Sequence, residues 1–331
     1  MESVRFGIIG CGAAAAFHTA GFEGIRDSKV SFVAAHDIDE EALHNFARTQ
    51  SVVPYRSLEE LLESDIDSVL ILLPHYLHAS VTKEAAKAGK HVLCEKPMAI
   101  TLEECDEMIE ATRKAGVKLM IAENHRFLPA HQLIKNFVER GFVGNVFLGR
   151  TYEGAFTDPN EFLDPEIWHF TYAKGGGGVL MDQGPHKFAM LNWILDSQVE
   201  SAQCWLSKAL PSPASKGEDS AAILLRYENG AMMDVVVSSS AVHPPNNVTE
   251  FHGTKGTILE DHSWEKPVKV LSSHPEAEKQ GEYYSPEVEH GPFPKYYPIS
   301  ARVEDTYFAD CILHDRKPEF TPEQAKEAIA V

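Results

Sequence analysis

Residues 7–16 read GIIGCGAAAA, an apolar run that ends in a turn of small residues. The run from Val4 to Ile9 has the unbroken apolar character of a strand buried on both faces. Gly10, Gly12 and Ala15 then give the spacing G-x-G-x-x-A. In a strand-turn-helix unit the first small residue permits a tight turn, the second admits a pyrophosphate, and the third lets helix and strand pack closely. Taken alone, such a turn also fits a unit that binds no ligand.

A second strand and a carboxylate follow in the order that a dinucleotide site requires. Residues 30–35 read VSFVAA, and Asp37 comes just after them. An acid at this point accepts a hydrogen bond from the ribose 2′-hydroxyl and repels a 2′-phosphate, so the sequence favours NAD over NADP. The phosphates are expected to meet the start of the first helix, at Cys11, Gly12, Ala13 and Ala14.

Composition and charge restrict the kinds of partner. The chain has 331 residues, enough for two domains, and 44% of them are hydrophobic. The formal net charge of −19 repels nucleic acid and anionic membranes, and we expect neither as a partner. The five cysteines are widely spaced without a C-x-x-C pair, which indicates reduced thiols and a cytoplasmic protein. The 16 histidines show no metal-ligand spacing with the cysteines, so no metal is expected.

The first 123 residues alternate short apolar runs with helical segments. Helix starts are marked by capping residues, namely Asp37 or Asp39, Ser57 with Glu60, and Thr101 with Glu104. Such alternation is typical of an α/β domain with a doubly wound parallel sheet. Residues 1–123 are therefore expected to form a dinucleotide-binding domain.

After residue 123 the pattern changes to long alternating segments, as in half-buried strands. Asn229-Gly230, between two of these segments, is a strong signal for a hairpin turn. Residues 124–331 are therefore expected to form an α+β domain that binds substrate on a large, mostly antiparallel open sheet. Because one face of such a sheet needs cover, we expect a homodimer or homotetramer formed through it.

Polar residues follow three of the predicted strands of the first domain. The segments are Pro74 to His78, Glu95-Lys96-Pro97, and Asn124-His125-Arg126-Phe127. Ligands of open parallel sheets bind at the carboxyl ends of the strands, although each turn by itself also fits a solvated loop. The further cofactor-binding candidates are Leu73, Pro74, His75, His78, Glu95, Lys96 and Asn124.

The four glycines at residues 175–178 introduce a second informative segment, which ends at His186. Asp182 and His186 are four residues apart, so a helix would present both on one face, with Pro185 in its first turn. The same pair also fits a helix-capping aspartate and a surface histidine.

Taken together, these motifs resemble those of the glucose-fructose oxidoreductase/inositol dehydrogenase/rhizopine catabolism (Gfo/Idh/MocA) family. The matching motifs are G-x-G-x-x-A, the acid after the second strand, Pro74-x-x-x-His78, Glu95-Lys96-Pro97, His125-Arg126-Phe127 and Asp182-x-Gly-x-His186. They occur in order along essentially the whole chain. The Glu-Lys-Pro and Asp-x-x-x-His segments are the most specific of them.

The resemblance implies an N-terminal Rossmann domain, NAD or NADP as the cofactor, and oxidation of a secondary alcohol of a sugar, sugar derivative or cyclitol, or the reverse reduction. Asp37 makes NADP the less favoured of the two cofactors. Lys96 matches the catalytic lysine of the family, and Asp182 and His186 match its carboxylate and its acid/base histidine. The roles suit the chemistry, because loss of hydride from a carbinol carbon also requires loss of the hydroxyl proton, which an imidazole accepts near neutral pH. A lysine ammonium stabilises the oxygen on which negative charge develops.

Other residues are candidates for contact with the substrate. The substrate-binding set is Lys96, Arg126, Trp168, His169, Asp182 and His186. Trp168 offers a face for stacking on a sugar ring, and core packing explains it equally well.

Two other functions fit the same motifs. One is a glycosidase that uses tightly held NAD for a transient oxidation, which net hydrolysis with unchanged NAD would reveal. The other is a non-catalytic, dinucleotide-sensing regulator. The joint presence of Lys96, Asp182 and His186 favours a dehydrogenase, because a sensor has no need of all three.

Overall fold

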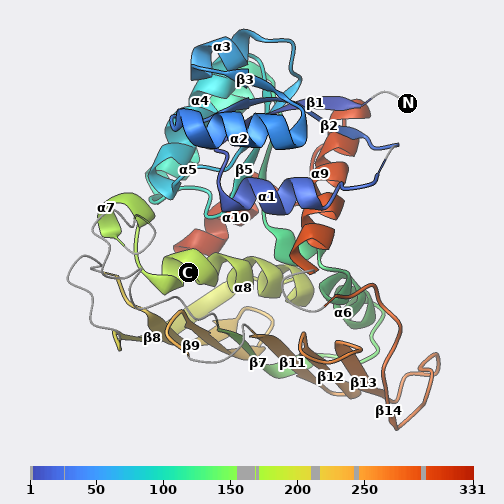
Figure 1. Ribbon diagram of the computed structural model, residues 1–331. Coiled ribbons are helices and arrows are strands. Elements are labelled where there is room, and N and C mark those ends of the chain that lie inside the picture. The colour runs from blue at the N-terminus through green and yellow to red at the C-terminus, as the bar shows by residue number, and fades with distance from the viewer. Residues whose placement is uncertain are drawn as a thin grey trace. The chain divides into compact units, whose positions relative to one another are not determined.

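The computed structural model describes residues 3–25, 27–154, 168, 171–209, 217–241, 246–291 and 296–331. The chain forms two compact units, one of residues Met1–Asn124 with Tyr297–Ala330, and one of His125–Tyr296. The sequence-based division assigned 124–331 to a single domain, whereas in the structure the last helices group with the first unit. Figure 1 labels the elements of both units.

The first unit contains a six-stranded sheet in the order β3-β2-β1-β4-β5-β6. Its strands are β1 (Val4–Ile9), β2 (Val30–His36), β3 (Val53–Tyr55), β4 (Ser68–Ile71), β5 (His91–Glu95) and β6 (Leu119–Ala122). All neighbouring strands are parallel, which confirms the predicted doubly wound sheet. In this order the chain reverses direction of winding between β1 and β4, and the crevice outside the carboxyl ends of those strands is the ligand site of such sheets.

The helices of the first unit are α1 (Ala13–Ala20), α2 (Glu40–Gln50), α3 (Leu58–Glu63), α4 (His78–Lys87), α5 (Leu102–Ala115), α9 (Tyr296–Leu313) and α10 (Pro322–Ala330). Three of them, α2, α3 and α5, begin at capping residues that the sequence predicts. The side chain of Asp39 accepts hydrogen bonds from two N–H groups at the start of α2. Ser57 and Thr101 each accept one from the N–H three residues later, at the starts of α3 and α5.

The C-terminal helix α9 is part of the core of the first unit. Its Phe308 is fully buried and contacts Phe6 of β1, with 6.4 Å between the ring centroids. The side chain of Lys29 forms an ion pair with Asp310 of the same helix. Helix α9, which lies near the end of the chain, therefore packs against strand β1, which lies near its beginning.

The second unit contains an eight-stranded sheet in the order β14-β13-β12-β11-β7-β10-β9-β8. Its strands are β7 (Val146–Gly154), β8 (Val199–Ser207), β9 (Ser220–Tyr227), β10 (Met232–Ser238), β11 (Asn246–Gly253), β12 (Gly256–Asp261), β13 (Val268–Ser272) and β14 (Tyr283–Tyr284). Neighbours are antiparallel except β7 and β10, which are parallel, so the predicted mostly antiparallel sheet is confirmed. Asn229-Gly230 forms the turn between β9 and β10, with Gly230 at φ 88°.

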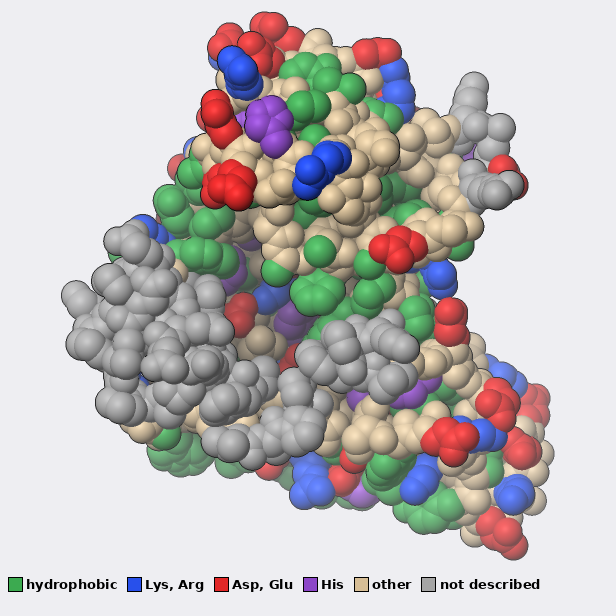
Figure 2. All heavy atoms as spheres, viewed as in Figure 1, with side chains coloured by type: hydrophobic (Ala, Val, Ile, Leu, Met, Phe, Trp, Pro, Cys, Tyr) green, Lys and Arg blue, Asp and Glu red, His purple; other side chains and the backbone are tan. Residues whose placement is uncertain are grey.

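The two faces of this second sheet differ in character. Helix α8 (Val179–Leu195) lies across one face, with α6 (Pro129–Glu139) beside it and α7 (Tyr172–Gly175) preceding it (Figure 1). Val235 and Val237 of β10 are fully buried, whereas Met232 is 54% exposed and Leu224 of β9 is 50% exposed. Figure 2 shows Lys and Arg side chains interspersed with Asp and Glu over β12 to β14. One ion pair near these strands joins Lys266 to Glu287. Within the described parts of the chain, no helix is long and apolar enough to cross a membrane.

Candidate active site

The turn after β1 is shaped for close approach of a ligand. Gly10 has φ +98°, and a Cβ atom there would overlap the carbonyl oxygen of Leu72, so only glycine fits. A Cβ at Gly12 would meet open space. Because Gly12 precedes α1 and has no side chain, the first N–H groups of the helix, at Ala13 and Ala14, are not capped by it. Such a helix start suits the phosphates of a dinucleotide.

Asp37 organises the same turn. Its Oδ2 accepts a hydrogen bond from the N–H of Cys11 at 2.7 Å, and its Oδ1 accepts one from the N–H of Asp39 at 2.9 Å. The carboxylate thus stands at the end of β2 beside the phosphate-binding turn, where a ribose hydroxyl would meet it. Burial and the neighbouring carboxylate raise the pKa of Cys11 to about 12, so the thiol stays uncharged. The residues present therefore fit the NAD that the motif implies.

Two more turns of the first unit are tied to each other by His78. Its ring is fully buried, with Nδ1 2.8 Å from the carbonyl oxygen of Pro97 and Nε2 2.8 Å from that of Leu73. The loop after β4, which holds Pro74 and His75, is thereby joined to the loop after β5, which holds Lys96. His75 is buried, and its ring lies 5.8 Å from that of His78.

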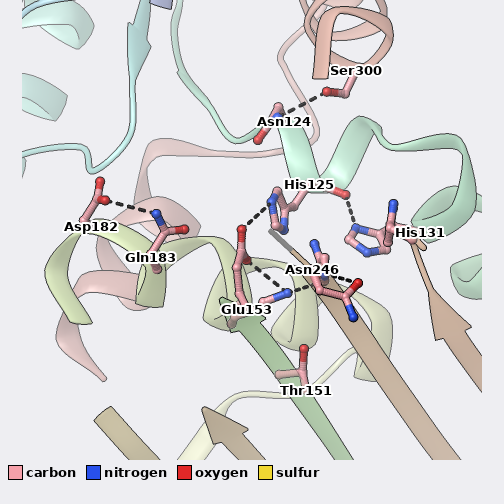
Figure 3. A network of polar contacts seen from close by, with 12 residues as sticks. Asn124, His125, His131, Thr151, Glu153, Asp182, Gln183, Asn246 and Ser300 are labelled. Carbon is pink, nitrogen blue, oxygen red and sulfur yellow. Dashed lines mark hydrogen bonds and ion pairs between the residues drawn. The ribbon is translucent and has the colours of Figure 1, made fainter. Parts of the chain in front are cut away.

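Other predicted cofactor residues stand at the ends of β5 and β6. Glu95 is the last residue of β5, and its carboxylate accepts a hydrogen bond from the N–H of Lys96. Asn124 follows β6, and its amide donates a hydrogen bond to Ser300 Oγ at 3.2 Å (Figure 3). All the predicted cofactor residues therefore belong to the first unit. They include Lys96, which is also the predicted catalytic lysine.

Asp182 and His186 lie on one helix of the second unit, as predicted. The helix begins at Val179, however, so Pro185 is inside it, and the prediction that Pro185 lies in the first turn is wrong. The reason is tertiary: Glu218 accepts hydrogen bonds from the N–H groups of Val179 and Leu180 and so fixes an earlier start. A Cβ at Gly178 would overlap the carbonyl oxygen of Glu218, which explains a glycine at this position.

The ring of His186 is buried against a second histidine. It stacks on His125 with 4.3 Å between centroids and 12° between ring planes. His125 Nε2 lies 3.6 Å from the carboxylate of Glu153 on β7, as Figure 3 shows. Burial above all, and then the nearby His186 and Lys187, hold the pKa of His125 well below its ordinary value. His125 is therefore neutral at neutral pH and adds no positive charge beside His186.

A buried lysine follows His186 directly. Lys187 is fully buried, its Nζ lies 3.1 Å from Glu153 Oε2, and it donates a hydrogen bond to Asn247 Oδ1. Glu153 thus faces both Lys187 and His125. Glu153, Lys187 and Asn247 were not predicted from the sequence. The one signal for them in the sequence is a lysine within the apolar stretch from His186 to Leu195.

His125 is also held from its main chain. The ring of His131 donates through Nδ1 to the carbonyl oxygen of His125 at 2.6 Å (Figure 3). Its Nε2 lies 3.0 Å from Glu260. Glu260 also faces His262 at 2.8 Å. Burial opposes ionisation of Glu260, but the two histidines outweigh it and hold its pKa well below the ordinary value. A buried polar network therefore supports the residue on which His186 stacks.

Three of the remaining predicted substrate residues can be placed in the structure. Asp182 accepts a hydrogen bond from the side chain of Gln183 at 3.0 Å (Figure 3). Arg126 is buried, with its guanidinium carbon 5.0 Å from the ring centroid of Trp193, a contact that the sequence did not suggest. Trp168 is half-buried and accepts hydrogen bonds at its carbonyl from Thr171. His169 lies outside the described residues.

Known proteins match both parts of the chain. The model described as oxidoreductase family, NAD-binding Rossmann fold, matches residues 4–123, and the GFO/IDH/MocA C-terminal domain matches residues 131–259. The uncharacterized oxidoreductase YrbE of Bacillus subtilis is 33% identical over 278 residues, 82% of this chain and 78% of the relative. Myo-inositol 2-dehydrogenase of Thermotoga maritima is 30% identical over 269 residues, 80% and 77% of the two chains. The solved structure of levoglucosan dehydrogenase with NADH and levoglucosan has a TM-score of 0.87, at 22% identity, over 99% of this chain and 95% of that one.

The fold and the phosphate-binding turn define the class of protein as an oxidoreductase with an NAD-binding Rossmann domain. The chain belongs to the Gfo/Idh/MocA oxidoreductase family. The resemblance drawn from the motifs is thereby confirmed.

Proposed function

We propose that the protein is an NAD-dependent dehydrogenase that oxidises a secondary alcohol of a sugar, sugar derivative or cyclitol. The observation that carries the proposal is that Asp182 and His186 both lie on α8, four residues apart, with the ring of His186 stacked on a neutral histidine. The relatives support the substrate class, because one is a myo-inositol dehydrogenase and one a levoglucosan dehydrogenase.

In the proposed reaction three side chains act on one hydroxyl of the substrate. NAD, when bound, accepts the hydride from the carbinol carbon. His186 Nε2 or Nδ1 takes the hydroxyl proton, and Asp182 orients the substrate or the imidazole. Lys96 stabilises the negative charge that grows on the oxygen as the proton leaves. The proposal therefore requires Lys96 of the first unit and His186 of the second to serve one substrate.

A substrate screen tests this function. The purified protein is incubated with NAD and with levoglucosan, myo-inositol, aldoses, uronates or glycosides, and formation of NADH is followed by its absorbance. We expect NADH to accumulate with at least one free sugar or cyclitol. Hydrolysis of a glycoside with no net NADH would favour the glycosidase, and binding of NAD with no turnover of any of these compounds would favour the regulator.

Replacing Asp37 by alanine is expected to weaken NADH binding about 10-fold and to narrow the preference for NADH over NADPH. The carboxylate is expected to accept hydrogen bonds from the ribose and to repel a 2′-phosphate. Titrations of cofactor fluorescence with both reduced cofactors measure the ratio. Asp39→Ala is the control, because Asp39 caps α2 two residues away. An unchanged ratio in Asp37→Ala would mean that the acid does not touch the ribose.

We also propose that copies of the chain associate through the exposed face of the second sheet as a homodimer or homotetramer. That face carries Trp205, Leu224 and Met232, with exposed fractions of 57%, 50% and 54%. Leu224→Glu is expected to shift the mass measured by light scattering to that of a monomer, because a carboxylate opposes apolar association. Ile38→Glu, an equally severe change at an exposed residue of the first unit, is expected to leave the mass unchanged. A wild-type protein that is monomeric throughout would contradict the proposal.

A further inference from the structure

A buried series of polar contacts in the first unit ends at the main chain of Lys96. Glu95 Oε2 accepts the N–H of Lys96 at 2.8 Å. The other oxygen, Glu95 Oε1, lies 3.4 Å from Nε2 of His18 on α1. His18 Nδ1 lies 3.0 Å from both carboxylate oxygens of Asp305 on α9. Figure 1 shows α1 and α9 side by side in this unit.

The geometry favours a charged imidazole. His18 is 2% exposed and Asp305 is 1% exposed, so water does not screen the contact between these two side chains. A neutral imidazole has one N–H and cannot donate to two carboxylates, whereas the imidazolium donates from both nitrogens. Burial by itself lowers the pKa of His18, but Asp305 and Glu95 outweigh burial and hold the pKa well above its ordinary value. His18 is therefore a buried cation between two acids at neutral pH.

A third acid beside His18 does not compete for this charge. Glu304 is fully buried, and neither of its carboxyl oxygens makes a hydrogen bond within the described residues. Burial raises its pKa well above the ordinary value, and Asp305, Glu95 and Glu123 add to the effect against the opposing charge of His18. Burial therefore favours the uncharged form of Glu304, and Glu95 and Asp305 are the acids whose oxygens contact His18. Burial also raises the pKa of Asp305, against the opposing effect of His18.

We propose that His18 and Asp305 are positioning residues for Lys96, a role that rests on the catalytic part proposed for Lys96 above. Asp305 fixes His18, His18 fixes one oxygen of Glu95, and the other oxygen then holds the N–H of Lys96. The lysine is thereby held at the point where its side chain leaves the main chain. The cation also balances the charge of Glu95, the acid next to Lys96 in the chain. Helix α9, far along the sequence, contributes in this way to the candidate active site.

The variant Asp305→Asn tests the role with little change in shape. The amide no longer favours the imidazolium, so His18 loses its proton at a lower pH. The series of contacts is intact below the pKa of His18 and is lost as the pH rises through it. We therefore expect the alkaline limb of the kcat profile to move down by about one pH unit or more, and kcat at pH 8 to fall about 10-fold. The Kd for NADH should change less than about 2-fold. Kinetics use levoglucosan or myo-inositol, whichever reduces NAD faster.

Asp310→Asn is the matched control. Asp310 lies on the same helix, but its carboxylate pairs with Lys29 and Arg316. Its replacement is expected to leave kcat within about 2-fold and the alkaline limb unmoved. Equal losses in the two variants would mean that α9 has only a packing role, and would overturn the proposal. If Asp305→Asn folds poorly, Glu95→Gln is the alternative variant, because it removes the other acid that contacts His18. It is expected to move the alkaline limb of the kcat profile to lower pH as well.

Nuclear magnetic resonance of ¹⁵N-histidine-labelled protein reads the protonation of His18 without any substrate. The His18 signal is identified by its loss in His18→Gln. We expect His18 to keep imidazolium shifts to a higher pH than an ordinary histidine in the wild type and in Asp310→Asn, and to have a lower titration midpoint in Asp305→Asn. An unchanged midpoint, or a lowered midpoint with the wild-type kcat profile, would overturn the proposal. Activity that survives Lys96→Ala would instead refute the proposed function. The resonance measurement of His18 protonation does not depend on that function, so the two failures can be told apart.

Discussion

Replacing His186 by alanine is expected to lower kcat by about 10²- to 10⁴-fold, because the hydroxyl proton then has no positioned acceptor. Lys96→Ala is expected to lower kcat by about 10²-fold or more, because the growing negative charge on oxygen loses its cation. Both variants should still bind NADH, since the phosphate-binding turn at Gly10 and Gly12 is untouched. Steady-state kinetics and titrations of NADH fluorescence separate the two effects.

Suitable controls are His44→Ala and Lys114→Ala, which remove exposed side chains of the same types from α2 and α5. They are expected to keep activity within about 2-fold of the wild type. If both His186→Ala and Lys96→Ala kept wild-type turnover, the assignment of these residues would be refuted. If they abolished NADH binding as well, their role would be structural.

Replacing Glu153 by leucine is expected to lower the free energy of unfolding by about 3–5 kcal/mol. The side chain of Lys187 is fully buried, and Glu153 is the acid that neutralises it. Without that acid, the ammonium would be left with a hydrogen bond to the neutral side chain of Asn247. A buried charge without its counter-ion is far more costly than the loss of one hydrogen bond. Urea unfolding followed by circular dichroism measures the change.

The double variant Glu153→Leu/Lys187→Met removes both charges and is expected to be more stable than Glu153→Leu alone. A matched control on the same sheet is Glu250→Leu, whose carboxylate pairs with the exposed Arg150 and should cost less than about 1 kcal/mol. The single variant Lys187→Met completes the cycle. Additive effects of Glu153→Leu and Lys187→Met in the double variant, or a loss under about 1 kcal/mol in Glu153→Leu, would contradict the prediction.

Features whose partners are close in sequence could be predicted from the sequence. Asp39, Ser57 and Thr101 cap helices through N–H groups two or three residues later. Asn229-Gly230 closes a hairpin because the strands on either side pair directly. The turn at Gly10 was predictable for the same reason, since its shape depends on a strand and a helix that adjoin it.

Site residues of the second unit were predicted only in part. Asp182 and His186 stand on one face of a helix, which their spacing determines, and the structure has both on α8. The start of that helix was not predictable, because the main chain and side chain of Glu218 set it from 38 residues away. The stacking of His125 on His186 joins two segments with no shared pattern in the sequence.

By itself, the sequence determined the kind of chain this is: a parallel sheet with a phosphate-binding turn, followed by a mostly antiparallel sheet, with the motifs of one oxidoreductase family. Tertiary structure alone decided the parallel pairing of β7 with β10, the ion pair of Glu153 with Lys187, and the contact of Asp305 with His18. The reason is physical. Hydrophobic period, capping and turn chemistry act over a few residues, whereas a buried charge acquires its partner only when distant elements pack together.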